Sequence, residues 1–326
     1  MNQRYREIMI VLAALFLTAC GGGDSSLEEG TAKSYSSLGE YKDVVSRYPE
    51  DGLTADHYVV YYPKDATTPD TPVVLFLEGG GSAPKIDDYR GVMAFMASQG
   101  YFVIGAESGE SYDSVYAASI FEKALDVAKG AHGLTLSKLA VMGHSQGGGQ
   151  AFYVMKYFQD QLHGGYGSEG SLVISIDGWF AFTMNQADLQ ALQGDTAFIQ
   201  MNGLEGTGND PRIYLSIWNL AQQTDRMYLT LPQDNHGYVY GGLDDLLENK
   251  KDLLYLLGAL TDDTFSNTKE GYDSIPDARK TTYDTMENSL HPQSQYSEDC
   301  NGTKYNARDA QLKYNDIDYC AYESYL

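Results

Sequence analysis

The sequence predicts an α/β protein whose mostly parallel β-sheet is covered by helices on both faces. From about residue 56 to residue 257, short apolar runs alternate with longer segments of helical periodicity, which is typical of a chain that adds a parallel strand after each helix. Several runs are apolar without alternation, as in strands buried on both faces. With 326 residues, of which 43% are hydrophobic, the chain can bury one sizeable core.

The first part of this pattern contains three strands and two helices. His57 to Tyr62 is rich in Tyr and Val, and Pro72 to Leu77 is a continuous apolar run, so both are expected to be strands. A helix is expected at Asp87 to Gln99, where Gly100 ends the amphipathic pattern. The next elements are the strand Tyr101 to Ala106 and the helix Ser114 to Lys129, which Gly130 is expected to end.

The second part repeats the alternation with four strands and three helices. Pro211 is expected to begin one of these helices, because its restricted φ suits the first helical turn. Strands are expected at Lys138 to Met142, Leu172 to Ile176, Thr196 to Met201 and Arg226 to Leu231. Helices are expected at Gln146 to Gln159, Pro211 to Gln223 and Leu243 to Leu257.

The clearest catalytic motif is Gly143-His144-Ser145-Gln146-Gly147, which follows an apolar strand directly and opens a helix. In a Gly-x-Ser-x-Gly turn the serine is held in a strained backbone conformation, and the two glycines remove side chains that would collide across the bend. The N–H groups and the positive dipole end of the following helix point at the serine. We therefore expect Ser145 to be a nucleophile and His144 to line the turn or pack locally.

Residues from about 55 to 260 resemble the α/β-hydrolase superfamily, in particular exported cutinase-like and polyester-hydrolase-like esterases. Their motif reads Gly-x-Ser-x-Gly-Gly-Gly, as Gly143 to Gly149 does here. The resemblance implies an α/β-hydrolase fold, in which the nucleophile, the acid and the histidine base follow one another along the chain. About 19 residues, Asp177 to Asp195, separate two of the expected strands. This length leaves no room for the large cap domain that some members insert there.

Serine attack needs a general base, and imidazole titrates in a suitable range. The order in the superfamily requires a late base, and His236 lies in the loop after the last expected strand, where the superfamily carries its histidine. His291 lies in the polar C-terminal part and is expected to be a solvated loop residue. His57, His132 and His163 precede the expected acid, so each is expected to be a surface or packing residue.

The acid that orients the imidazole is expected after the strand Thr196 to Met201, where two carboxylates compete. Glu205 stands four residues past the end of this strand, at the position where the superfamily usually carries Asp. Asp210 comes just before a proline and has an alternative role as the N-cap of the next helix. Glu205 is the predicted acid, and Asp210 stays open as the alternative.

Two backbone N–H groups are needed to bind the oxyanion of a tetrahedral intermediate. One is expected from Gln146, directly after the nucleophile. The other is expected from Gly80, with Gly81 as the second candidate, because residues 78–81 (Glu-Gly-Gly-Gly) resemble the His-Gly-Gly-Gly loop of esterases. Trp179 stands where polyester-hydrolase-like enzymes carry a Trp, and is expected either to bind substrate or to pack as a half-buried residue.

These residues predict a serine hydrolase that cleaves carboxylic esters through an acyl-enzyme, with Ser145 as nucleophile, His236 as base and Glu205 as acid. The reaction would need no metal or other cofactor. An open, uncapped site favours bulky or polymeric esters. Two alternatives remain: the same triad could act on amides as an amidase or peptidase, or the chain could be a surface-binding lipoprotein on a hydrolase scaffold without turnover.

The first 19 residues are expected to be a lipoprotein signal peptide. Two arginines precede an apolar run from Ile8 to Leu17, which is shorter than the about 20 residues of a membrane span. Leu17-Thr18-Ala19-Cys20 resembles the lipobox of bacterial lipoproteins, whose Cys carries the lipid. An ordinary signal peptide is the alternative. Gly21 after that Cys favours the outer membrane, by resemblance to Gram-negative lipoproteins.

The rest of the chain divides into a lipid-anchored tether and lead-in (20–50), a catalytic domain (51–260) and a polar, Tyr-rich tail (261–326). Cys300 and Cys320 in the tail are expected to form a disulfide, with a metal site as the alternative. The formal charge of −23 argues against nucleic acid and anionic membrane surfaces as partners. We expect an extracytoplasmic protein, anchored to a bacterial membrane by its lipid, whose partner is an ester substrate and which has no obligate protein partner.

Overall fold

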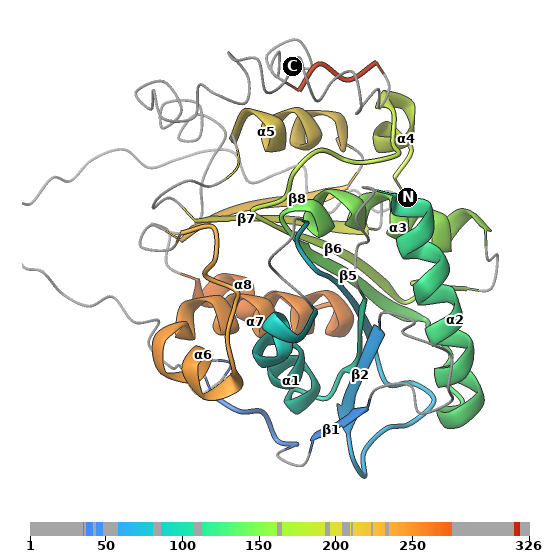
Figure 1. Ribbon diagram of the computed structural model, residues 1–326, viewed down its shortest axis with the longest axis vertical. Helices are drawn as coiled ribbons and strands as arrows, with labels where there is room; N and C mark the ends of the chain where they lie inside the picture. The colour runs from blue at the N-terminus through green and yellow to red at the C-terminus, as the bar shows by residue number, and fades with distance from the viewer. Residues whose placement is uncertain are drawn as a thin grey trace, which may run out of the picture.

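The computed structural model describes residues 35, 37–41, 44–47, 58–80, 86–106, 113–161, 165–192, 196–203, 209, 211–222, 224–231, 235–275 and 316–319. Its centre is an eight-stranded sheet in the order β1-β2-β4-β3-β5-β6-β7-β8 (Figure 1). The strands are β1 (Val44–Arg47), β2 (Tyr58–Pro63), β3 (Val73–Leu77), β4 (Phe102–Ala106), β5 (Lys138–His144), β6 (Gly170–Ile176), β7 (Thr196–Gly203) and β8 (Asp225–Leu231).

Six of the strands, from β4 through β3 and β5 to β8, run parallel to their neighbours. The other two are antiparallel to the strand beside them, β2 to β4 and β1 to β2. The predicted α/β class with a mostly parallel sheet is therefore confirmed. Because parallel strands end at one edge of the sheet, the residues after β5, β6, β7 and β8 come together there.

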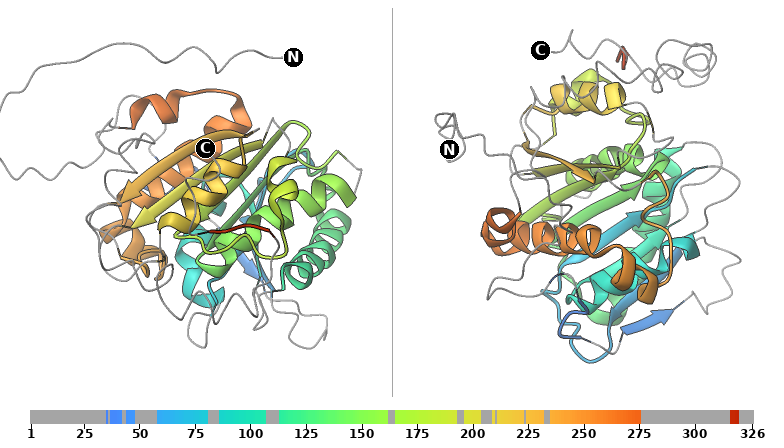
Figure 2. Two further views of the ribbon diagram at one scale, coloured as in Figure 1. Left: turned by 90° about the horizontal axis from the view of Figure 1, so that it is seen from above. Right: turned by 90° about the vertical axis from the view of Figure 1, so that its left-hand side faces the viewer.

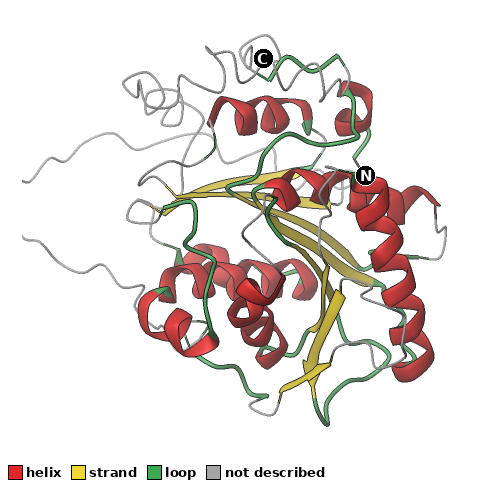
Figure 3. Ribbon diagram, in the orientation of Figure 1, coloured by secondary structure: helices red, strands yellow, loops and turns green. Residues whose placement is uncertain are grey.

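Helices cover both faces of the sheet, as Figures 2 and 3 show. Alternate side chains of one strand point to opposite faces. In β3, Leu75 packs in the core layer under α2, α3 and α5, whereas Phe76 packs in the layer under α1 and α7. The helices are η1 (Ile86–Tyr89), α1 (Arg90–Ser98), α2 (Ser114–His132), α3 (Gln146–Gln161), α4 (Gln186–Gln190), α5 (Pro211–Leu220), α6 (Leu243–Asn249), α7 (Lys251–Ser266) and α8 (Glu270–Ser274).

Three elements differ from the expected pattern for local reasons. Helix α2 continues to His132, because the glycine that adopts a left-handed conformation at its end is Gly133, with a φ of 69°, rather than Gly130. The expected helix at Leu243 to Leu257 is two helices, α6 and α7, which Lys250 separates with a φ of −130°. Strand β1 and the short helix α4 were not predicted.

The C-terminal part contributes to both core layers. Helix α7 runs across residue 261, the expected start of the polar tail, and its Phe265 is buried together with Ile275. Ile317 and Tyr319 are buried against the opposite face. A few apolar anchors therefore hold a segment whose average composition is polar.

The N-terminal 34 residues, with the expected signal peptide and Cys20, lie outside the described residues, as do Cys300 and Cys320. Among the helices that the structure does describe, none combines the length and the apolar character needed to cross a membrane.

Candidate active site

Ser145 forms the tight turn between β5, which ends at His144, and α3, which begins at Gln146. Its φ of 52° lies in the left-handed region, which residues other than glycine rarely adopt. The Ser145 N–H donates to the carbonyl of Ile176 at the end of β6 at 2.9 Å, and the Ser145 carbonyl accepts from the N–H of Trp179 at 2.9 Å. The strained turn is thus held from the neighbouring strand.

The two motif glycines are required by close backbone approach. A Cβ atom on Gly143 would lie 2.2 Å from the carbonyl oxygen of Gly147, and one on Gly147 would lie 2.3 Å from the carbonyl oxygen of Glu78. Backbone oxygens cannot rotate out of the way as a flexible side chain can. The turn therefore needs glycine at both positions, in agreement with the reason given for the motif.

His236 reaches the serine from the loop after β8. Its Nε2 lies 3.1 Å from Ser145 Oγ, within hydrogen-bond distance. The loop is attached to the segment before α1, because the Gly241 N–H donates to the Asp88 carbonyl at 2.9 Å and the Gly91 N–H donates to the Gly241 carbonyl at 3.1 Å. The residues expected to be nucleophile and base are therefore in contact.

The carboxylate beside His236 belongs to Asp177, the first residue after β6. Its Oδ2 lies 3.3 Å from Nδ1 of His236. Its Oδ1 accepts from the side-chain amide of Asn202 at 3.0 Å and from the N–H of Gly203 at 3.1 Å. Asp177 itself has a positive φ of 42°. Ser145, His236 and Asp177 thus form a continuous row of hydrogen-bonding groups.

This arrangement corrects the predicted acid. Glu205 and the alternative Asp210 both lie outside the described residues, and the carboxylate on Nδ1 of His236 is that of Asp177. The segment after β7 contributes differently, since Asn209 donates its side-chain N–H to the Asp177 carbonyl at 2.7 Å. The signal in the sequence was an Asp placed directly after the buried strand next to the nucleophile strand.

Asp177 is 1% exposed, whereas the side chain of His236 is 28% exposed. Burial raises the pKa of the Asp177 carboxyl, and the hydrogen bond and charge of His236 oppose this, together with the donors from Gly203 and Asn202. A carboxylate removed from water and held by fixed donors is suited to orient an imidazole and to stabilise its protonated form. The imidazole, in turn, has one side open to solvent.

The loop expected to bind the oxyanion lies against the start of α3. A Cβ atom on Gly80 would lie 1.6 Å from the side-chain oxygen of Gln146, so the two expected donors are adjacent. Gly79 already donates its N–H to the Tyr89 hydroxyl at 2.7 Å, which leaves the donor role to Gly80 in this loop. Glu78 is buried, and its charge contributes to raising the pKa of Tyr89, after burial and other causes. Gly81 lies outside the described residues.

Trp179 is half-buried and adjoins the nucleophile through its backbone bond to the Ser145 carbonyl. Its ring stacks on Phe180, with centroids 5.6 Å apart, and packs against the core layer on this face. The expected packing role is therefore present, while the ring lies two residues from Asp177. His132, expected to be a packing residue, packs against Tyr62 and Phe102.

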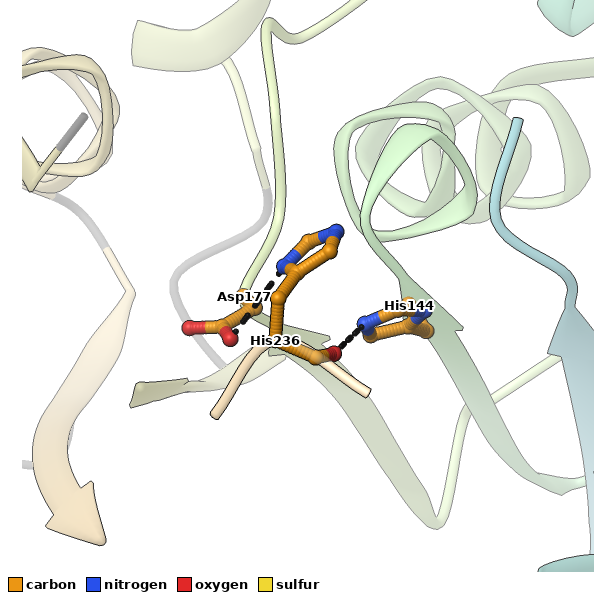
Figure 4. A group of neighbouring side chains, drawn as sticks. All are labelled: His144, Asp177 and His236. Atoms are coloured by element: carbon orange, nitrogen blue, oxygen red, sulfur yellow. Dashed lines mark hydrogen bonds and ion pairs between the residues drawn. The ribbon is translucent and has the colours of Figure 1, made fainter. Parts of the chain in front are cut away.

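His144, Asp177 and His236 place potential metal-ligand atoms within 4.8 Å of one another (Figure 4). Each imidazole nitrogen already has a protein partner, however. His144 Nε2 contacts the His236 carbonyl and Nδ1 contacts the Tyr89 hydroxyl, while the two nitrogens of His236 contact Ser145 and Asp177. The group therefore has the geometry of a hydrogen-bonded network rather than of a ligand set that converges on one ion.

The arrangement supplies a nucleophile, a base in contact with it and a buried carboxylate behind the base. Compared with protein-family models and with curated proteins, the chain matches none of them.

Proposed function

We propose that the protein is a serine hydrolase of the α/β-hydrolase fold, which cleaves carboxylic esters through an acyl-enzyme. The observation that carries the proposal is the row of Ser145, His236 and Asp177, with contacts of 3.1 and 3.3 Å. The nucleophile stands at a positive φ between a strand and a helix, which is the geometry of a nucleophile elbow. The strand order, with antiparallel strands at the N-terminal edge only, supports the fold assignment.

In the acylation step, Ser145 Oγ attacks the ester carbonyl carbon while His236 Nε2 takes the hydroxyl proton. Asp177 holds Nδ1–H toward itself and stabilises the imidazolium that forms. The same proton then passes from Nε2 to the alkoxy oxygen, the bond to the carbonyl carbon breaks, and the alcohol leaves. The acyl group stays on Ser145.

In the deacylation step, His236 takes a proton from a water molecule, which attacks the acyl carbon. Collapse of the second tetrahedral intermediate releases the carboxylic acid and returns the proton to Ser145. In both steps the oxyanion would be bound by the backbone N–H groups of Gln146 and Gly80. The helix N-terminus at Gln146 adds a favourable electrostatic contribution at the same place.

An open site follows from the short connection between β6 and β7. It contains only α4, a helix of five residues, and no large cap domain fits in it. The 28% exposure of the His236 side chain is in keeping with this. We therefore propose bulky or polymeric esters as substrates, with the half-buried Trp179 supplying an apolar face for an acyl or aromatic group.

The test compares the wild type with Ser145→Ala on p-nitrophenyl butyrate and on a peptide p-nitroanilide. We expect ester turnover by the wild type and loss of that turnover in the variant. Turnover of the anilide alone would identify an amidase instead. A folded wild type that hydrolyses neither compound, and that a fluorophosphonate does not label, would contradict the enzyme proposal.

We also propose, from the sequence, that Cys20 carries a lipid and that Cys300 and Cys320 form a disulfide. Membrane fractionation of cells that express the full chain tests the first proposal. The wild type should sediment with membranes and incorporate labelled fatty acid, and Cys20→Ala should do neither. Peptide mapping under non-reducing conditions tests the second, since the two cysteine peptides should be recovered as one linked species.

A further inference from the structure

His144, the residue before the nucleophile, is fully buried and has a partner at each ring nitrogen. Its Nε2 lies 2.7 Å from the main-chain carbonyl oxygen of His236, and its Nδ1 lies 2.9 Å from the Tyr89 hydroxyl. Figure 4 shows His144 beside the backbone of His236, on the side away from Asp177. The two imidazole rings are 4.6 Å apart between centroids.

These contacts determine the tautomer of His144. A carbonyl oxygen can only accept, so Nε2 must carry the hydrogen, and in a neutral ring Nδ1 must then accept one from Tyr89. The Tyr89 oxygen in turn accepts the N–H of Gly79 at 2.7 Å. The result is a chain with one direction: from Gly79 to Tyr89, from Tyr89 to His144, and from His144 to the His236 carbonyl.

The protonation states that this chain needs are favoured by burial. Burial lowers the pKa of His144 well below its ordinary value, and the nearby His236 adds to this. Burial also raises the pKa of Tyr89 well above its ordinary value. Both groups therefore stay neutral at ordinary pH, with Tyr89 as donor and His144 Nδ1 as acceptor.

The chain joins the two loops that must meet at the nucleophile. One end holds the main chain of His236, whose imidazole must reach Ser145. The other end holds Gly79, the neighbour of Gly80, in the loop that faces Gln146. Because His144 also belongs to the strand that carries Ser145, one buried side chain sets the base and the oxyanion loop relative to the nucleophile.

We propose that His144 is a positioning residue for the reaction: its neutral imidazole sets the His236 main chain and, through Tyr89, the Gly79–Gly80 loop relative to Ser145. The inference rests on the proposed hydrolase function. It assigns His144 no proton transfer to substrate, because both of its nitrogens are bonded within the protein.

Three substitutions separate hydrogen bonding from packing. His144→Phe keeps a buried ring but removes both bonds, His144→Gln keeps an N–H donor at the position of Nε2, and Tyr89→Phe removes only the link to the Gly79 loop. A displacement on the order of 1 Å at a reacting group lowers the rate by about 10²-fold. We therefore expect His144→Phe to lower kcat by about 10- to 100-fold with KM almost unchanged, His144→Gln to recover part of the loss, and Tyr89→Phe to have a smaller effect.

His132→Phe is the matched control, because it replaces another histidine that packs against aromatic rings but lies on α2. It should leave kcat unchanged. A folded His144→Phe variant with wild-type kcat, or a His144→Gln variant no more active than His144→Phe, would overturn the proposal.

Nitrogen-15 NMR of histidine-labelled protein gives a readout that does not depend on turnover. His144 should show the Nε2–H tautomer and no titration between about pH 5.5 and 8.5, since its ordinary pKa of about 6.5 is lowered by burial. The His236 resonances should shift in His144→Phe and not in His132→Phe. A titrating His144, or His236 resonances insensitive to His144→Phe, would contradict the positioning role even if the hydrolase function stands. A wild type without hydrolase activity would instead contradict the proposed function, and these spectra would still decide the role of His144.

Discussion

Asp177 Oδ2 lies 3.3 Å from Nδ1 of His236, at the end of the strand beside the nucleophile strand rather than one strand further along. Nucleophile and carboxylate therefore leave neighbouring strands. The backbone bonds of Ser145 to Ile176 and to Trp179 tie the two strand ends together. The loop that follows β7 contributes donors to Asp177 from Asn202 and Asn209.

Replacement of this carboxylate gives the first prediction. Asp177→Asn should lower kcat by about 10³- to 10⁴-fold, because the amide favours the wrong imidazole tautomer and cannot stabilise the imidazolium. Glu205→Gln and Asp210→Asn, prepared as controls, should stay within a few-fold of the wild type. Steady-state rates on p-nitrophenyl butyrate measure all three. A large loss in Glu205→Gln with an active Asp177→Asn would restore Glu205 as the acid.

The oxyanion loop gives the second prediction. In Gly80→Ala the added methyl group would meet the Gln146 side chain, 1.6 Å from its oxygen, so the loop must shift away from α3. Since loss of one oxyanion donor lowers kcat by about 10²- to 10³-fold, a displaced donor should cost up to about 10²-fold, with a smaller change in KM. Gly130→Ala is the control: its Cβ meets nothing within 4 Å in an exposed helical position. That change should raise the free energy of unfolding by about 0.5–1 kcal/mol and leave kcat unchanged.

Burial of His144 predicts how stability depends on pH. The pKa of His144 is lowered in the folded state, so below the ordinary value of about 6.5 the unfolded chain binds a proton that the folded protein excludes. The charged and titratable groups that face this ring are His236, Tyr89 and Tyr240, with Glu78 close to the two tyrosines. Stability should fall as the pH falls below about 6.5, by at most about 1.4 kcal/mol per pH unit from this one group.

Urea unfolding at several pH values between 7 and 5 measures this slope. His144→Phe should show a smaller loss of unfolding free energy over that interval than the wild type does. His132→Phe serves as the comparison for the removal of a histidine elsewhere. Equal slopes in the wild type and in His144→Phe would show that His144 binds a proton in the folded state as readily as in the unfolded chain.

Most of the fold could be predicted because its elements have strong local patterns. The strands from β2 to β8 are apolar runs between glycines and polar loops, and the elbow at Ser145 follows from a motif with its own steric reason. Strand β1 was missed because its short sequence, Val-Val-Ser-Arg, has no distinctive pattern. The break at Lys250 was missed because the apolar spacing of α6 and α7 reads as continuous.

The site was predictable only where the chain order carries the information. Ser145 stands in a motif and His236 stands alone in the right loop, but the acid depends on which strand end faces the imidazole. That is a tertiary property: β6 and β7 both end near His236, and backbone geometry at Asp177, including its φ of 42°, decides between them. The contact of His144 with the His236 carbonyl spans 92 residues and has no local signature.

The C-terminal segment gives a further prediction, concerning stability. Tyr319 is 4% exposed, its hydroxyl accepts the Ala181 N–H at 3.0 Å, and its ring meets Phe180 edge-on with centroids 4.7 Å apart. Tyr319→Phe leaves that N–H without its partner and should lower the unfolding free energy by about 1–3 kcal/mol. Tyr319→Ala also removes the ring and should cost about 3–5 kcal/mol. Equal stability of all three proteins in urea would mean that this segment does not support the loop after Asp177.

Chelators provide the fifth prediction. The nitrogens of His144 and His236 are engaged with the His236 carbonyl, Tyr89, Ser145 and Asp177, so the proposed chemistry runs through hydrogen-bonded side chains. Dialysis against EDTA should leave kcat on p-nitrophenyl butyrate unchanged, and added Zn²⁺ should not raise it. Loss of activity on chelation, restored by one metal, would favour a metal site at His144, Asp177 and His236.

The central claim is that His236 activates Ser145 for covalent catalysis, and peptide mass spectrometry after treatment with a fluorophosphonate tests it most directly. The account predicts one adduct, on the peptide that contains Ser145, absent in Ser145→Ala and formed far more slowly in His236→Gln. An unmodified Ser145 in a folded wild type, or an adduct that forms at the same rate without His236, would contradict it.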